Sequence, residues 1–138
     1  GSYTLQIQDV TSENADYEIA TRVLVPNPMG GLNVPGSIDG DLNDYAIDIY
    51  TYSAGSDGSV RAEVTSDRTP QNTDMDGILM IYNPAGGLVA VNDDVDAMTV
   101  DPGVMYDQVN GTTYWVVIDA YSMDVMGPNT YTFASELQ

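Results

Sequence analysis

The strongest constraint on the fold is an alternation of apolar and polar side chains, with a period of two, along almost the whole chain. Gly, Pro, Asn and Asp interrupt it at short intervals, as is typical of strands that end in tight turns. The longest stretch with a helical period covers only residues 13–24. The pattern therefore predicts an all-β fold, a jelly-roll-like antiparallel β-sandwich of about eight to ten strands.

The alternation also locates individual strands. Turn residues at 55–58 separate two of them, and Asn83-Pro84-Ala85-Gly86 predicts the turn of a β-hairpin. Residues 114–120 form the most apolar run and are expected to make a central strand. In 44–50 we expect Tyr45, Ile47 and Ile49 on one face, toward the core, and Asp44 and Asp48 on the other. The predicted strands cover residues 3–8, 44–50, 59–64, 77–82, 87–91, 114–120 and 130–134.

Charge and composition exclude several classes of function. The 138 residues carry 21 Asp and Glu against three basic residues, for a formal net charge of -18. Nucleic-acid binding is therefore not expected, because phosphates are bound through clustered cations, and binding to anionic lipid is disfavoured for the same reason. We expect no membrane insertion, because no segment is apolar over the length of a bilayer span.

The chain lacks both histidine and cysteine, which limits its chemistry. This excludes histidine-based triads, histidine-ligated zinc, thiol chemistry, iron-sulfur clusters and disulfides. Two carboxylates suffice for a glycosidase, but a sandwich of this length offers little substrate cleft. We therefore expect a protein that is not an enzyme.

The acidic residues gather in two groups along the chain. Calcium is bound by six to eight oxygens from carboxylates, amides and backbone carbonyls, which acidic turns at strand ends can supply. Solvation of turn residues and adaptation to a saline habitat would also account for such groups, and both stay open beside calcium. The first group contains Glu13, Asp16, Glu18, Asp39, Asp41 and Asp44, and the second contains Asp74, Asp76, Asp93, Asp94, Asp96 and Asp101.

Aromatic residues raise the alternative of a carbohydrate- or protein-binding surface. The chain holds ten tyrosines and one tryptophan, and exposed rings can stack on sugars and pack on peptides. Strand periodicity assigns about half of the tyrosines to the core, and we expect Trp115 to lie in the interior. The candidates are Tyr50, Tyr52, Tyr106, Tyr114 and Tyr121, of which Tyr114 and Tyr121 are the ligand-binding residues we select.

A short internal similarity bears on domain organisation. Residues 1–5 resemble residues 129–133, since in both a Tyr-Thr-apolar run follows a small or turn-forming residue. Chance also explains so short a match. Otherwise residues 1–11 are interpreted as the last strand of a preceding repeat, as an added strand beside the C-terminal one, or as a tag and linker. The domain itself is expected to cover residues 12–138.

The order of motifs resembles a known family. Ser12-Glu13-Asn14-Ala15-Asp16 is similar to an opening Glu-Pro-Asn-Asp, and the Val34–Ile38 and Asp44-Tyr45 stretches follow in order. The hairpin of residues 76–94, the Gly111–Ile118 strand and the closing Tyr131-Thr132-Phe133 complete the pattern. Together these motifs resemble the bacterial pre-peptidase C-terminal domain, a β-sandwich related to the collagen-binding domains of collagenases.

The resemblance implies a calcium site joining the N-terminal segment to the sandwich. Thr11 and Ala15 stand where the pattern has further oxygen ligands, so a weaker site is expected. On the strand that binds collagen in the relatives, Tyr121 matches a tyrosine but Asp119 replaces another, so collagen binding is not expected. The implied calcium ligands are Glu13, Asp16, the Ser37 carbonyl, Asp41 and Asp44.

The resemblance also implies a function. It is that of a non-catalytic accessory module of a secreted or cell-surface bacterial protein, serving as a spacer, a secretion or folding aid, or an adhesion domain. Its expected partners are neighbouring domains of the parent chain and an extracellular glycan or protein. We expect the module itself to be a monomer.

Overall fold

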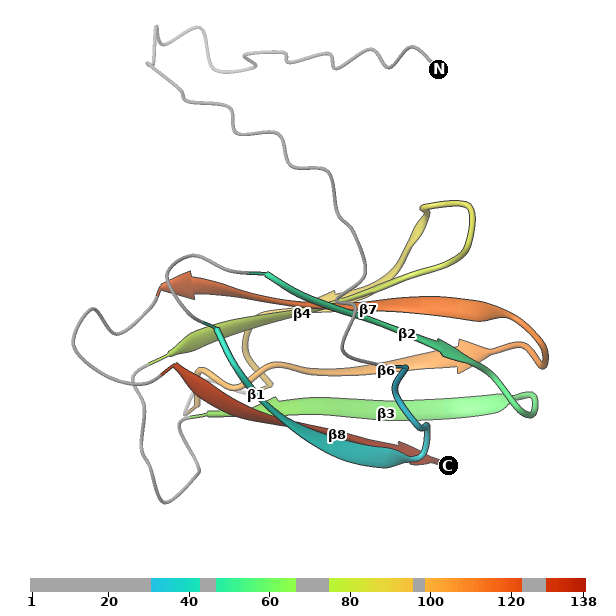
Figure 1. Ribbon diagram of the computed structural model, residues 1–138, viewed down its shortest axis with the longest axis horizontal. Coiled ribbons are helices and arrows are strands. Elements are labelled where there is room, and N and C mark those ends of the chain that lie inside the picture. Colours follow the sequence, from blue (N-terminus) through green and yellow to red (C-terminus); the bar gives the residue numbers. More distant parts are fainter. Residues whose placement is uncertain (1–30, 43–46, 67–74, 96–98, 123–128) are drawn as a thin grey trace, which may run out of the picture.

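The computed structural model describes residues 31–42, 47–66, 75–95, 99–122 and 129–138, without the side chains of 121 and 122. Two antiparallel four-stranded sheets face each other in this part of the chain (Figure 1). The strands are β1 (Gly36–Asp41), β2 (Asp48–Ser53), β3 (Gly58–Thr65), β4 (Asp76–Tyr82), β5 (Leu88–Asn92), β6 (Gly103–Gln108), β7 (Thr113–Ser122) and β8 (Thr130–Leu137).

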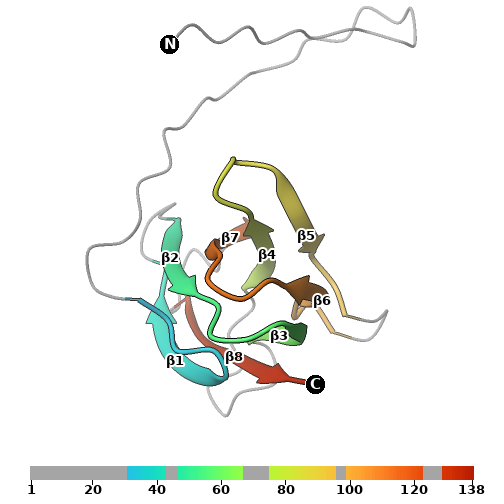
Figure 2. The ribbon, with the colours of Figure 1, turned by 90° about the vertical axis from the view of Figure 1, so that its right-hand side faces the viewer.

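The strand order is that of a jelly roll. One sheet has the order β1-β8-β3-β6 and the other β2-β7-β4-β5. The chain thus forms a long hairpin in which β1 pairs with β8, β2 with β7, β3 with β6 and β4 with β5. Rolling that hairpin adds the pairs β3 with β8 and β4 with β7, so the two sheets enclose one core (Figure 2). The predicted fold class is confirmed.

The core contains the inward-facing residues of both sheets. Phe133, Leu79, Ile81, Val60 and Val116 are among its fully buried side chains. On β7, the core residues alternate with side chains that face away from the partner sheet, as a pleated strand requires. Within the described ranges, no helix is long and apolar enough to cross a lipid bilayer.

Most of the strands located from the sequence are confirmed. The predicted hairpin joins β4 to β5, and the Asn83 side chain accepts hydrogen bonds from the amides of Ala85 (3.0 Å) and Gly87 (2.9 Å) in its turn. Gly86 has a φ of 80°, which glycine adopts without steric cost. β7 is central in its sheet, as expected. The predicted strand at residues 3–8 lies outside the described residues.

Two strands were missed, and one strand was assigned the wrong inner face. β1 and β6 were not predicted, and Asp39 and Asp41, expected in a strand-end loop, lie within β1. In β2, Tyr50 belongs to the core, whereas Ile49 is buried on the opposite face. The prediction that Ile49 faces the core is therefore wrong, because Tyr50 finds buried partners for its hydroxyl.

Candidate functional site

The first acidic group is only partly described, and the described part does not form one metal site. Ser37 and Asp41 lie on the same strand, β1, four residues apart. A strand rises about 3.3 Å per residue, so these residues are about 13 Å apart. Calcium binds its oxygens at about 2.4 Å, so the Ser37 carbonyl and the Asp41 carboxylate cannot ligate one ion. The inclusion of Ser37 in a site with Asp41 is corrected accordingly.

The remaining members of this group differ in their surroundings. The Asp39 carboxylate accepts a hydrogen bond from the Thr132 hydroxyl (2.8 Å) on the neighbouring strand β8. Asp41 is exposed at the end of β1 and is available to a cation. Glu13, Asp16 and Asp44 lie outside the described residues. Among the residues that the structure does describe, no group of three or more acidic side chains is arranged to hold a metal ion.

The second acidic group brings three carboxylates near one another at one end of a sheet. Asp76 begins β4, and Asp93 and Asp94 follow β5, its hairpin partner. Partial burial raises the pKa of Asp76, and the negative charges of Asp94 and Asp93 raise it further. These three carboxylates therefore lie close enough for their charges to interact, while Asp74 and Asp96 lie outside the described residues.

Asp101 has a different role from its neighbours in the sequence. It is fully buried, and its Oδ1 accepts a hydrogen bond from the Ser66 amide (2.6 Å) and lies 3.0 Å from the Ser66 hydroxyl. The Ser66 hydroxyl also donates to the Met75 carbonyl (2.9 Å). Asp101, which precedes β6, is thus bonded to Ser66 at the end of β3, and Ser66 in turn bonds to the chain that leads into β4. We assign Asp101 to the framework of the fold.

We expect Asp76→Asn to stabilise the protein at neutral pH. The folded-state pKa of Asp76 lies above its unfolded value, so its contribution to stability decreases as pH rises from about 4 through the folded-state pKa. Removing the charge should therefore raise the melting temperature at pH 7 by about 2 °C, after allowance for solvent screening. The gain should vanish near pH 3, and Asp107→Asn on the exposed side of β6 serves as control. A lower melting temperature of Asp76→Asn in calcium-free buffer would contradict this electrostatic account.

The tyrosines selected as a binding surface lie mainly inside the sandwich. Tyr114 is 4% exposed, its ring stacks on that of Tyr52 with centroids 5.5 Å apart, and its hydroxyl accepts a hydrogen bond from the Val109 amide (3.0 Å). The selection of Tyr114 as a surface ligand-binding residue is therefore corrected. Tyr52 and Tyr106 are buried as well, with their hydroxyls bonded to each other. Tyr121 belongs to β7, and its side chain is outside the described part.

A second buried cluster joins the two sheets through Tyr131. Its hydroxyl donates to Oδ2 of Asp48 (2.5 Å) and lies 2.9 Å from the Tyr50 hydroxyl, which is 3.4 Å from the same Oδ2. Asp48 and Tyr50 belong to β2 and Tyr131 to β8, so the cluster bridges opposing sheets. The Asp48 charge is held by hydroxyl donors, which makes its inward position acceptable.

Alkaline titration should separate the core tyrosines from the exposed ones. Burial raises the pKa of Tyr50, Tyr52 and Tyr131 above the usual 10, and raises the pKa of Tyr106 to about 12. The folded state therefore retains protons that the unfolded chain releases, so stability falls as pH rises above about 10. We expect phenolate absorbance at 295 nm to rise in two steps, the second coinciding with the loss of β-sheet circular dichroism. A single step with a pKa near 10 in the folded protein would contradict the placement of these rings.

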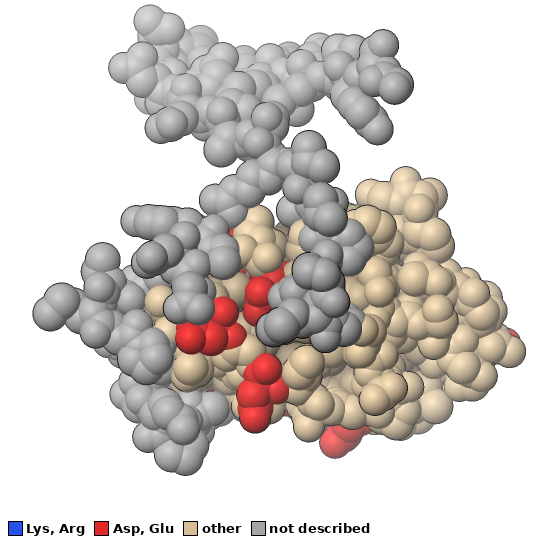
Figure 3. Space-filling model, in the orientation of Figure 1, with Lys and Arg blue, Asp and Glu red and all other residues tan. Residues whose placement is uncertain are grey.

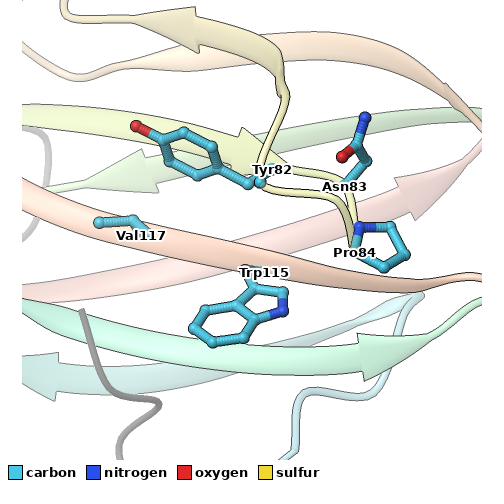
Figure 4. A pocket seen from close by; sticks show the side chains of 6 residues that line it. Tyr82, Asn83, Pro84, Trp115 and Val117 are labelled. Carbon is cyan, nitrogen blue, oxygen red and sulfur yellow. The ribbon is translucent and has the colours of Figure 1, made fainter. Parts of the chain in front are cut away.

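A pocket of about 250 Å³ opens on the outer face of the sheet β2-β7-β4-β5. Figure 4 shows the rings of Tyr82 and Trp115 beside β7, with the turn residues Asn83 and Pro84 at one end. Gly86 and the buried Val117 complete its lining. Trp115 was expected in the interior, and the structure instead places it partly exposed on the outer face. The sequence could have predicted this outer position, because Trp115 lies between the core residues Tyr114 and Val116 and successive strand residues point to opposite faces.

Charge distinguishes this pocket from much of the surface. None of its six lining residues is acidic or basic. Elsewhere acidic side chains are prominent, and on the face shown in Figure 3 the charged side chains visible among the described residues are acidic. The arrangement is therefore suited to an uncharged, apolar group rather than to a cation or a phosphate.

Comparisons with known proteins support the fold. Neither the protein-family models nor the curated proteins give a match. Among solved structures, the chain is similar to the crystal structure of the pre-peptidase C-terminal domain of a collagenase from Bacillus anthracis. The TM-score is 0.56 at 14% sequence identity, and the match covers 74% of this chain and 89% of that chain. At this identity the likeness concerns the fold, and it confirms the sandwich that the motif resemblance implied.

Proposed function

We propose that the chain is a non-catalytic accessory module of a secreted or cell-surface bacterial protein, stabilised by calcium. The observation that carries this proposal is the fold shared with the collagenase pre-peptidase C-terminal domain, since the match takes in 89% of that domain. The likeness therefore extends over nearly a whole domain of that kind. In this role the module acts as a spacer, a folding or secretion aid, or an adhesion domain for the parent chain.

The use of polar groups in the described sandwich agrees with such a role. The buried hydroxyls of Tyr50 and Tyr131 are bonded together with Asp48, and buried Asp101 is bonded to Ser66. These groups stabilise the fold instead of lining the pocket, whose side chains are mainly apolar.

Calcium is the finer part of the proposal. Asp41 is an exposed carboxylate where β1 ends, and Asp44 follows three residues later, close enough in sequence to converge on one ion. Glu13 and Asp16 precede the sandwich and complete the proposed ligand set, from which Ser37 is removed. A calcium ion there would neutralise part of the charge of -18 and tie the N-terminal segment to the end of β1.

Calcium titration calorimetry on the metal-free full chain tests this ligand set. We expect saturable binding that weakens at least about tenfold in Asp41→Asn, because the site loses one charged oxygen ligand. Asp107→Asn, an equally conservative change on exposed β6, should bind like the parent within about twofold. Equal affinity in both variants would remove Asp41 from the site, and no saturable heat in the parent chain would remove calcium.

Binding assays in calcium separate the candidate accessory roles. A glycan array and a collagen pull-down test adhesion directly, and silence in both supports the spacer role. The tyrosine-based binding alternative is weaker than the sequence suggested, because the Tyr114 ring is enclosed in the core.

A further inference from the structure

We propose that the pocket formed by Trp115 and Tyr82 is an intramolecular docking site for the N-terminal segment of the same chain. Residues 23–29 are the proposed occupant, with an apolar side chain seated between the two rings. This inference goes beyond the accessory function and does not require calcium.

The pocket is one end of an apolar strip across the outer face of its sheet. Val117 is fully buried at its floor although it faces away from the core cluster. On β5, Leu88 is 53% exposed and pairs with Tyr82, and Val91 is 52% exposed and pairs with Met80. Leu88 and Val91 thus leave apolar surface exposed beside the pocket on a strongly acidic protein, the kind of surface that another segment can cover.

The described chain begins beside this strip. Gly31 forms a parallel bridge with Thr51 of β2, and the Leu32 amide donates to the Thr51 carbonyl (2.9 Å). Thr51 is the direct register partner of Trp115 on β7. The thirty preceding residues therefore join the sandwich one strand away from the indole ring.

Direction and reach both favour docking. Because the bridge is parallel, an extended continuation of the chain before Gly31 would run toward the Ile49 end of β2, and Ile49 pairs with Val117 at the pocket floor. Neighbouring strands are about 4.8 Å apart, so β7 lies about 10 Å from the line of Gly31. An extended chain covers this distance in about three to four residues, so residues 23–29 can reach the pocket.

The chemistry of the segment matches that of the pocket. Residues 23–29 read Val-Leu-Val-Pro-Asn-Pro-Met and carry no charge, whereas the acidic residues of the N-terminal segment lie further back at Asp9, Glu13, Asp16 and Glu18. The part of the N-terminal segment closest in sequence to Gly31 is thus uncharged and largely apolar, as is the lining of the pocket.

Trp115 supplies a direct probe, because it is the only tryptophan in the chain. The chain also has no cysteine, so a nitroxide can be placed on a single introduced thiol. We would label full-length Asn27→Cys and, as a matched control, Gln8→Cys, and compare Trp115 fluorescence before and after chemical reduction of the nitroxide. The measurement is made in EDTA, so its outcome is independent of the calcium proposal.

Docking predicts contact quenching at the near position alone. The nitroxide at Asn27→Cys should lower Trp115 emission at least about twofold, since such quenching needs close approach, and the effect should vanish in urea. The nitroxide at Gln8→Cys should leave emission nearly unchanged. Met29→Cys is the second labelling position, used if circular dichroism shows that the Asn27 variant does not fold.

Three outcomes would overturn the proposal. Absence of quenching from folded Asn27→Cys and Met29→Cys would leave the pocket without this occupant, and equal quenching from Gln8→Cys would show non-specific collapse. Quenching of unlabelled parent chain by a labelled Asn27→Cys, Trp115→Phe chain would identify a second copy as the occupant.

Discussion

Replacing Gly40 by alanine is expected to lower the melting temperature by about 10 °C, corresponding to about 3 kcal/mol of lost stability. A Cβ at Gly40 would lie 2.2 Å from Cζ and 2.3 Å from the hydroxyl oxygen of Tyr131, its register partner on β8. The ring cannot move aside freely, because its hydroxyl is bonded to Asp48 and Tyr50 on the opposing sheet. Overpacking here therefore also breaks the hydrogen bonds that join the sheets.

Gly55→Ala is the matched control for this substitution. Gly55 lies in the turn between β2 and β3, where an added Cβ meets no atom within 4 Å. Its melting temperature should therefore stay within about 2 °C of the parent protein. Equal melting temperatures for Gly40→Ala and Gly55→Ala would contradict the close contact between β1 and Tyr131.

Tyr131→Phe is expected to cost about 2 kcal/mol, because it removes a hydrogen bond to a carboxylate in a buried setting. The Tyr131 hydroxyl donates to Asp48 at 2.5 Å, and without it the hydroxyl contact left to Asp48 among the described residues is that with Tyr50 at 3.4 Å. The ring volume is unchanged, so urea unfolding should shift its midpoint with little change in slope. This measurement isolates the hydroxyl from the packing of the ring.

Tyr82→Phe controls for loss of a tyrosine hydroxyl as such. Within the part of the chain that is described, the Tyr82 hydroxyl is bonded to the Met80 sulfur (3.5 Å), a weak acceptor on the partly exposed outer face. Its loss should cost less than about 0.5 kcal/mol. If the two variants were equally stable, the Asp48 and Tyr131 pair would contribute nothing specific to joining the sheets.

Local patterns predicted those parts of the fold that local chemistry determines. The β4–β5 hairpin depends on Asn83 and Gly86, whose turn geometry is encoded within a few residues. The apolar run of residues 114–120 located β7 and its central position in the sheet. Strand β1 was missed because glycines and acidic residues dominate it, and its stability comes from pairing with β8, almost a hundred residues away.

The inner face of β2 depended on a contact that no local pattern contains. Asp48 and Tyr50 face inward because Tyr131, 83 residues after Asp48, supplies the hydroxyl donor. Without that hydrogen-bond partner, burying the Asp48 carboxylate would cost more free energy than burying Ile49. The sequence pattern therefore favoured an inner face that contains Ile49.

The candidate sites were predictable only in part. The sequence could predict that three carboxylates lie close together, because β4 and β5 form a hairpin. The start of β4, at Asp76, therefore lies next to the end of β5, which Asp93 and Asp94 follow. The separation of Ser37 from Asp41 could not be predicted without knowing that both belong to one extended strand. The Trp115 pocket was missed because tryptophan was expected to be buried in the core. The alternation along β7 places the Trp115 side chain on the outer face of the sheet instead.

The central claim is that calcium stabilises an accessory module. The most direct test is the melting temperature of the full chain under three matched conditions. The conditions are EDTA at low ionic strength, millimolar calcium, and sodium chloride at the ionic strength of the calcium sample. Calcium at about 100 times its dissociation constant should add about 2.7 kcal/mol, or about 8 °C, beyond sodium chloride. Equal melting temperatures in calcium and sodium chloride would contradict the claim and leave salt adaptation as the reason for the charge of -18.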